Sequence, residues 1–181
     1  ARIVQRAAAE RCESGAEDIY HKVSRWKGFE ELNINMVSNP DDVGLALWDG
    51  SYASISIANT VIGISDTVTT FRDALNPVIA EARFLRGMNY FFLVRWFGEV
   101  PVLTESNGYL ATSVEQSPVG DVYDFIVEDL LQAEAYLPVT QTDPTRPTKG
   151  AARALLAKVY LTMAGFPLSR TELYAAARDK A

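Results

Sequence analysis

The chain has 181 residues, of which 48% are hydrophobic and 22% charged, so it can bury the core of one compact domain. Its 17 Lys and Arg face 23 Asp and Glu, and the net charge of −6 disfavours binding to the phosphate backbone of nucleic acids. Its one cysteine, Cys12, excludes an intrachain disulfide and any multi-cysteine metal or cluster site.

A first long helix is predicted from Asp41 to about Ser65. It follows the start signal Asn39-Pro40-Asp41-Asp42. Its apolar and aromatic residues recur with helical spacing at Trp48, Tyr52, Ile55 and Ile62. The many β-branched residues would also suit a strand, but the run exceeds the usual strand length, so helix is favoured.

A second helix is predicted from Asn76-Pro77 to Phe97-Gly98. Proline suits a first-turn position, where its missing N–H costs nothing, and Gly98 suits the C-terminal stop. The helix carries Phe84, Leu85, Met88, Phe91, Phe92, Leu93, Val94, Trp96 and Phe97. This apolar density predicts a helix that is covered on most sides and forms the centre of the core.

The second half alternates helices with non-helical segments. Glu99–Pro118 is predicted to be a loop of about 20 residues, a length usually reserved for binding or interfaces. A helix over Val119–Leu137 follows, with Pro138 as its stop. Gln141–Thr148 is a linker, and the last helices are predicted over Lys149–Ala164 and from Thr171 to the end.

These helices partly match a tetratricopeptide repeat, in which small and aromatic residues recur at set positions of a helical pair. The first copy would have Gly87 and Tyr90, then Tyr123, Ile126, Leu130, Ala133 and Pro138. The second would have Ala157 and Tyr160, then Tyr174 and Ala177. We therefore predict repeats at 77–138 and 149–181, with ordinary helical packing that matches by chance as the alternative.

One stretch combines charged, aromatic and glycine residues: Glu81-Ala82-Arg83-Phe84-Leu85-Arg86-Gly87, Tyr90-Phe91, Leu93-Val94 and Phe97-Gly98-Glu99-Val100-Pro101. It resembles the signature of the SusD/RagB family of nutrient-binding lipoproteins. Three more blocks agree in order: Trp48, Tyr52, Ile55, Ala58-Asn59 and Ile62; then Val122-Tyr123, Ile126, Asp129-Leu130 and Ala133; then Arg146-Pro147-Thr148-Lys149-Gly150-Ala151-Ala152 with Ala157, Tyr160 and Leu161. The resemblance implies an all-α fold of tetratricopeptide-like helical pairs, an α-α superhelix with long inserted loops. It also implies that residues 1–181 are a single SusD-like N-terminal helical domain, a fragment of a longer protein.

The resemblance further implies a cell-surface protein that binds glycans and delivers oligosaccharide to a TonB-dependent, SusC-like outer-membrane transporter, without enzymatic activity or a cofactor. Attachment would be through a lipid anchor that this chain lacks. No apolar run approaches the roughly 20 residues that span a bilayer. Ala1–Arg11 carries charge in place of a signal-peptide apolar region, so an exported protein would have lost its targeting segment.

Sugar binding needs aromatic faces bordered by hydrogen-bonding groups. The candidates are Trp26, Phe29, Asn33, Asn35 and Tyr109, although Trp26 and Phe29 could instead cap the core. We interpret the signature residues as architectural: Trp48, Asn59, Glu81, Arg83, Phe84, Leu85, Arg86, Tyr90, Gly98 and Pro101. Glu81, Arg83 and Arg86 would form ion pairs on the helix surface or anchor a neighbouring loop.

Two other functions compete with glycan binding. The first is a tetratricopeptide scaffold that binds a protein or peptide partner, for which the repeats are too few to form a groove. The second is a hydrolase, but His21 and Cys12 stand in no nucleophile or metal arrangement. Adjacent carboxylates on a helix diverge, so we interpret Glu30-Glu31, Asp41-Asp42 and Glu128-Asp129 as solvated or capping residues.

Overall fold

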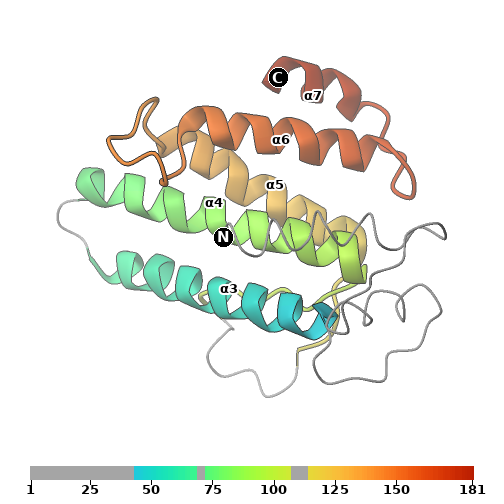
Figure 1. Ribbon diagram of the computed structural model, residues 1–181, viewed down its shortest axis with the longest axis horizontal. Coiled ribbons are helices and arrows are strands. Elements are labelled where there is room, and N and C mark those ends of the chain that lie inside the picture. The colour runs from blue at the N-terminus through green and yellow to red at the C-terminus, as the bar shows by residue number, and fades with distance from the viewer. Residues whose placement is uncertain (1–42, 69–71, 107–113) are drawn as a thin grey trace, which may run out of the picture. The chain divides into compact units, whose positions relative to one another are not determined.

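The computed structural model describes residues 43–68, 72–106 and 114–181. They form the helices α3 (Val43–Thr67), α4 (Arg72–Phe97), α5 (Val119–Tyr136), α6 (Lys149–Ala164) and α7 (Leu173–Lys180) (Figure 1). The chain divides by its internal contacts into Ala1–Gly50 and Ser51–Ala181, and the packing described here lies within the second unit. The prediction of an all-α fold is confirmed.

Within that unit α4 packs on α5, α5 on α6 and α6 on α7 (Figure 1). Near the start of α4, Ala80 is buried with Ala133 and Leu137 from the end of α5, whereas farther along α4 the Phe91 ring meets Tyr123 from the start of α5. The two helices are therefore antiparallel.

A small residue permits the close approach of α4 and α5. A Cβ at Gly87 would lie 3.2 Å from Leu130 Cγ, so the helices meet where the glycine has no side chain. Three residues later in α4, Tyr90 is fully buried. Its ring packs edge-on against Phe125, with 5.5 Å between the two ring centroids. The spacing noted in the sequence thus matches a real packing feature.

In the second half of the chain, Ala157, Tyr160 and Ala177 are also buried. Tyr174 is 51% exposed, so its ring does not fill a groove between helices as the repeat pattern would require. α7 begins at Leu173, after a turn that includes Thr171. The two-repeat assignment at 77–138 and 149–181 stays a prediction.

α3 is helical along its whole length, which settles the ambiguity that its β-branched residues left. Ile55, Ala58 and Ile62 share one face and are buried, because their spacing of three and four residues follows the helical period. Ala58 and Ile62 pack against Ala82 of α4, with Val61 and Ile79 at the edge of the cluster. Trp48, in the first turns of the helix, is half-buried.

The predicted start of α4 is wrong. The helix begins at Arg72, four residues before Asn76, and Pro77 lies inside it. Proline removes only the bond from position 77 to the carbonyl of Asp73, and a single turn precedes that position, so the helix extends past it. The predicted end is confirmed, because Gly98 adopts a φ of +73° and its N–H bonds to the Val94 carbonyl at 3.0 Å.

The expectation that α4 is covered on most sides is also wrong in part. Tyr90, Phe91, Leu93 and Val94 are buried, but Leu85 is 43% exposed, and Phe84 and Trp96 are half-buried. α4 packs on α3 and α5 and also meets α6, where Ala80 and Ala152 share a buried cluster, while Val78, Leu85 and Phe97 stay exposed. Among the described residues, the large buried side chains of α4 include a charged one, Arg86.

The described residues between α4 and α5, 98–106 and 114–118, are non-helical, as predicted, and the two stretches meet. Val100 and Ser117 form an antiparallel bridge, in which the Ser117 N–H donates to the Val100 carbonyl at 3.0 Å. α5 and α6 match their predicted ranges within one residue, and the Thr148 hydroxyl caps α6 by accepting from the Ala151 N–H. None of the described helices combines the length and apolarity needed to cross a bilayer.

Candidate functional site

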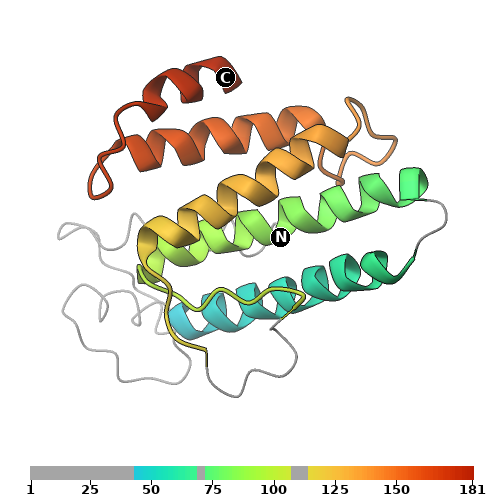
Figure 2. The same ribbon diagram turned by 180° about the vertical axis from the view of Figure 1, so that it is seen from behind.

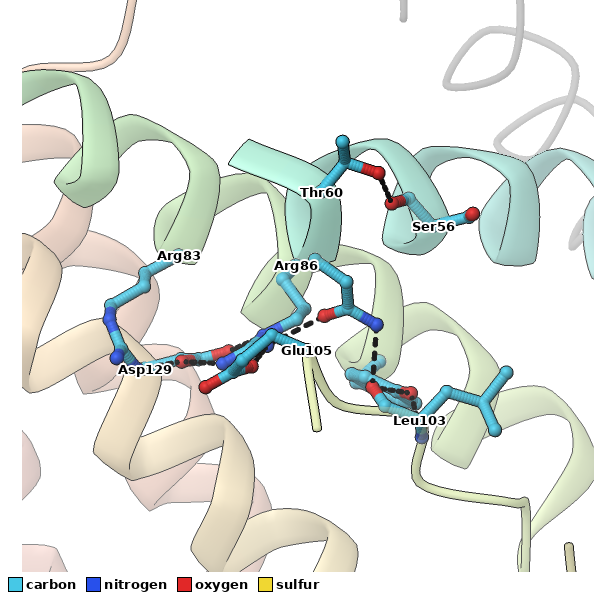
Figure 3. Close-up of polar contacts among 9 residues, drawn as sticks. Ser56, Thr60, Arg83, Arg86, Leu103, Glu105 and Asp129 are labelled. Carbon is cyan, nitrogen blue, oxygen red and sulfur yellow. Dashed lines mark hydrogen bonds and ion pairs between the residues drawn. The ribbon is translucent and has the colours of Figure 1, made fainter. Parts of the chain in front are cut away.

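The most unusual feature of the described structure is the buried guanidinium of Arg86, which is 1% exposed. Its Nε and Nη2 donate to the two carboxylate oxygens of Asp129 at 2.7 and 2.8 Å, in the forked geometry that arginine and carboxylate favour. Its Nη1 donates to Asn59 Oδ1 and to Glu105 Oε2, both at 2.6 Å (Figure 3). Arg86 therefore joins α3, α4, α5 and the segment after α4.

Asp129 is also 1% exposed and accepts a further bond from Arg83 Nη1 at 2.9 Å. The interpretation of Glu128-Asp129 as solvated or capping is therefore wrong for Asp129, whereas Glu128 is exposed. Asp129 lies three residues after Ile126 and four before Ala133, on the buried face of α5. The sequence feature that predicts the burial of Asp129 is the position of its carboxylate within the apolar stripe of α5.

The network is electrically balanced, since Arg83 and Arg86 face Asp129 and Glu105. Burial alone would lower the pKa of Arg86, but hydrogen bonds to Asp129 and Glu105 outweigh that effect and raise it above its usual value. Burial also tends to raise the pKa of Glu105, but the hydrogen bond from Arg86 brings it below the usual range. The guanidinium carbon lies 4.8 Å from the centre of the Phe125 ring, a favourable cation–π distance.

Residues Pro101–Glu105, here named the strap, are held between α3 and α4. The Tyr52 hydroxyl donates to the Pro101 carbonyl at 2.8 Å. The Tyr90 hydroxyl accepts from the Leu103 N–H at 2.7 Å and bonds the Leu103 carbonyl at 3.1 Å. Figure 2 shows the strap running along α3.

Asn59 connects the strap to the charge network. Its Nδ2 donates to the Leu103 carbonyl at 3.0 Å, while its Oδ1 accepts from Arg86. Burial raises the pKa of Tyr90 to about 12, so its hydroxyl keeps its proton at neutral pH. Side chains of α3 and α4 thus satisfy the strap's backbone as a neighbouring strand would.

Glu81 lies outside this network and fastens a different segment. It accepts from Gln141 Nε2 at 3.0 Å and from Arg146 Nη2 at 2.8 Å, which ties the α5–α6 linker to α4. Of the two roles considered for Glu81, Arg83 and Arg86, anchoring a neighbouring segment describes Glu81 and Arg86 better than surface pairing.

The other signature residues are dispersed. Phe84 packs on the cluster of Ala80, Ala133, Leu137 and Ala152, and Leu85 faces solvent. The proposed ligand residues Trp26, Phe29, Asn33, Asn35 and Tyr109 lie outside the described residues, as do Cys12, His21, Glu30-Glu31 and Asp41-Asp42.

This network can hold segments of the chain in fixed positions. Asp129 and Glu105 are both paired with Arg86, and the pairing holds the pKa of Glu105 below its usual range, away from that of a general acid at neutral pH. No group of three potential metal-binding side chains occurs among the residues that the structure describes. Fold and site together define a helical scaffold whose polar network fixes the strap against α3 and α4.

The family of the chain follows from its relatives. The model of the SusD-like family described as starch-binding and associating with the outer membrane matches residues 3–161, and the chain belongs to this family. A SusD-like protein P2 from Formosa agariphila is 34% identical over 143 residues, which are 77% of this chain and 28% of that protein. The chain therefore spans less than a third of the length of this curated relative.

Three solved structures have the same fold. A SusD superfamily protein from Parabacteroides distasonis has a TM-score of 0.77 and 34% identity, over 88% of this chain and 34% of that one. A structure with xylogluco-oligosaccharide has a TM-score of 0.77 and 29% identity, over 92% and 33% of the two chains. A laminarin-binding SusD-like protein has a TM-score of 0.69 and 30% identity, over 83% and 32%.

Proposed function

We propose that this chain is the helical scaffold of a protein that binds oligosaccharide at the outer membrane. The observation that carries the proposal is the family match over residues 3–161. Two structures that align with most of the chain are described with xylogluco-oligosaccharide and with laminarin, which are different glucans. The shared scaffold thus supports a glycan ligand as a class and leaves the particular sugar to other residues.

We propose that Trp26 and Phe29 stack on the apolar face of a sugar ring, and that Asn33 and Asn35 bond its hydroxyl groups. Tyr109, in the loop that starts at the strap, would add a further aromatic contact. Charged groups at the base of this loop, Arg86 and Glu105, are paired with each other, so we assign them no direct contact with the sugar.

We further propose that the protein is a surface-exposed lipoprotein without catalytic activity, which passes its ligand to a SusC-like, TonB-dependent transporter. The family's association with the outer membrane supports the location. Absence of catalysis is supported by the family, whose model is described by starch binding rather than by a reaction.

The test is a binding measurement on the full-length protein by isothermal titration calorimetry, with xyloglucan oligosaccharides, laminarin and starch oligosaccharides as ligands. We expect Trp26→Ala to weaken the affinity by about tenfold, since a stacked aromatic contributes about 1.4 kcal/mol. Phe166→Ala is the matched control, because Phe166 is a 92% exposed aromatic in the α6–α7 turn. Failure of the wild-type protein to bind any of these glycans would refute the proposed function, and equal affinity of the two variants would refute the role of Trp26.

A further inference from the structure

The strap lies between α3 and α4 and is hydrogen-bonded to both. From α3, the Tyr52 hydroxyl donates to the Pro101 carbonyl at 2.8 Å. Asn59, also on α3, donates from Nδ2 to the Leu103 carbonyl at 3.0 Å. From α4, the Tyr90 hydroxyl accepts from the Leu103 N–H at 2.7 Å. The backbone of Leu103 therefore connects the two helices.

The hydrogen bonds of Arg86 divide into two groups at its guanidinium. Its Nε and Nη2 hold the carboxylate of Asp129 on α5. Its Nη1 donates to Asn59 on α3 and to Glu105 on the strap (Figure 3). If the Nη1 bonds break, the buried charge of Arg86 keeps its forked partner Asp129. The contact between α4 and α5 can therefore persist without α3 and the strap.

The part of α3 that packs beside the strap has no charged side chain of its own, because Ser51–Ile64 contains no Asp, Glu, Lys or Arg. Its direct contacts with α4 include an apolar cluster (Ala58, Ile62, Ala82) and an edge-on pair of rings (Tyr52, Tyr90). It also packs on the strap, since a Cβ at Gly63 would lie 3.5 Å from Glu105 Cβ. The attachment of α3 to α4 thus depends in part on a segment that belongs to neither helix.

We infer that α3 and the strap form one conformational unit, which opens away from α4 as a whole while α4, α5 and α6 keep their own packing. The inference is independent of the proposed function. Proteins open locally in cooperative segments, each with its own free energy of opening. The strap controls this opening because, once Leu103 has left Tyr90, the bonds from Tyr52 and Asn59 to the strap no longer tie α3 to α4.

The experiment is hydrogen exchange followed by mass spectrometry on the full-length protein and two variants. Tyr90→Phe keeps the ring and removes the hydroxyl that bonds Leu103, without removing a hydrogen bond of α3. We expect amide exchange to become about tenfold faster in the strap and in α3 together, because the Leu103 N–H loses its acceptor. Exchange in α5 and α6 should be unchanged.

Asn59→Leu tests the same unit from the α3 side. It has a side chain of similar size and removes the bonds to Arg86 and to the Leu103 carbonyl. Arg86 keeps Asp129 and Glu105 as partners, so the stack of α4 and α5 stays intact. We expect the same joint rise in exchange as in Tyr90→Phe.

Two control variants make matched changes elsewhere. Tyr123→Phe removes a hydroxyl from a buried tyrosine of α5 whose ring packs on Phe91 of α4. Ser56→Ala removes a hydroxyl from the exposed face of α3. Both should leave the exchange of the strap and of α3 at the wild-type rate.

Three results would overturn the inference. Faster exchange in the strap of Tyr90→Phe, with α3 at the wild-type rate, would show that the strap opens alone. A rise that extends through α5 and α6 would show that all these helices open together. Wild-type exchange throughout Tyr90→Phe would show that the strap does not hold α3. Because Tyr90→Phe distinguishes these results by itself, the test does not depend on the folding of Asn59→Leu.

Discussion

Arg86 and Asp129 show how two charged residues can be more buried than most of the apolar ones around them. Each is 1% exposed, and both carboxylate oxygens of Asp129 accept hydrogen bonds from arginine. Phe125 lies within cation–π distance of the same guanidinium. The energetic consequence is asymmetric: the pair adds little as a whole, but removal of one partner leaves the other buried with only part of its compensation, Glu105 for Arg86 or Arg83 for Asp129.

Asp129→Ala is therefore expected to lower the free energy of unfolding by about 3–5 kcal/mol, because Arg86 would stay buried without its fork-shaped partner. The measurement is urea unfolding followed by circular dichroism. Glu128→Ala, an exposed carboxylate one position earlier on the same helix, should change the stability by less than about 0.5 kcal/mol. Similar midpoints for the two variants would contradict the assigned burial.

The helices are assembled through small residues and through the strap. α4 and α5 approach closely at Gly87, where a Cβ would lie 3.2 Å from Leu130 Cγ and 3.3 Å from its Cδ2. α3 and α4 meet through Ala58, Ile62 and Ala82 at one end, and through the strap farther along. The inserted loop is thus partly a structural element, because its first residues occupy the space between two helices.

Gly87→Val is expected to destabilise the protein by about 1–3 kcal/mol, since the added methyl groups overpack the contact with Leu130. Leu130→Ala should be destabilising alone, through a cavity, yet less so when combined with Gly87→Val, which would partly fill the space. Thermal unfolding of the two single variants and the double variant measures the coupling. Gly150→Val, at an exposed position of α6, is the control, and strict additivity of the pair would contradict the contact.

At the scale of the whole molecule, the described part combines a stack of helices with one polar network that connects three of them to the strap. One solved relative is described with xylogluco-oligosaccharide and another as laminarin-binding, and the portion that aligns with this chain is about a third of each. Loops on a rigid helical support can vary in sequence without disturbing the core.

Stability should fall at acidic pH through Glu105, whose pKa is held below its usual value by Arg86. A carboxylate with a lowered folded-state pKa contributes stability above its unfolded pKa, which is close to 4.5, and that contribution is lost as the pH falls through the folded-state value. Urea midpoints from pH 7 to pH 3 should therefore decline less in Glu105→Gln than in the wild type. Parallel pH profiles for the two proteins would contradict this contribution.

Helix positions and family could be predicted from the sequence because both depend on local patterns. Ile55, Ala58 and Ile62 follow the helical period, and Gly98 ends α4 where a left-handed residue is needed. The predicted start of α4 is wrong because the sequence pattern around a proline in the second turn of a helix resembles that around a proline in the first turn. The signature from Glu81 to Pro101 indicated the family, but it did not predict which hydrogen bonds its charged residues make.

Only the tertiary structure decided that Arg86 and Asp129 form a buried pair and that the strap lies between α3 and α4. Arg86 and Asp129 are 43 positions apart, and Asn59 and Leu103 are 44 apart, so no local periodicity relates them. A charged residue in an apolar stripe indicates that a partner must exist, because an unpaired buried charge is too costly. Which residue is that partner depends on how the helices stack, and that is settled by packing across the whole core.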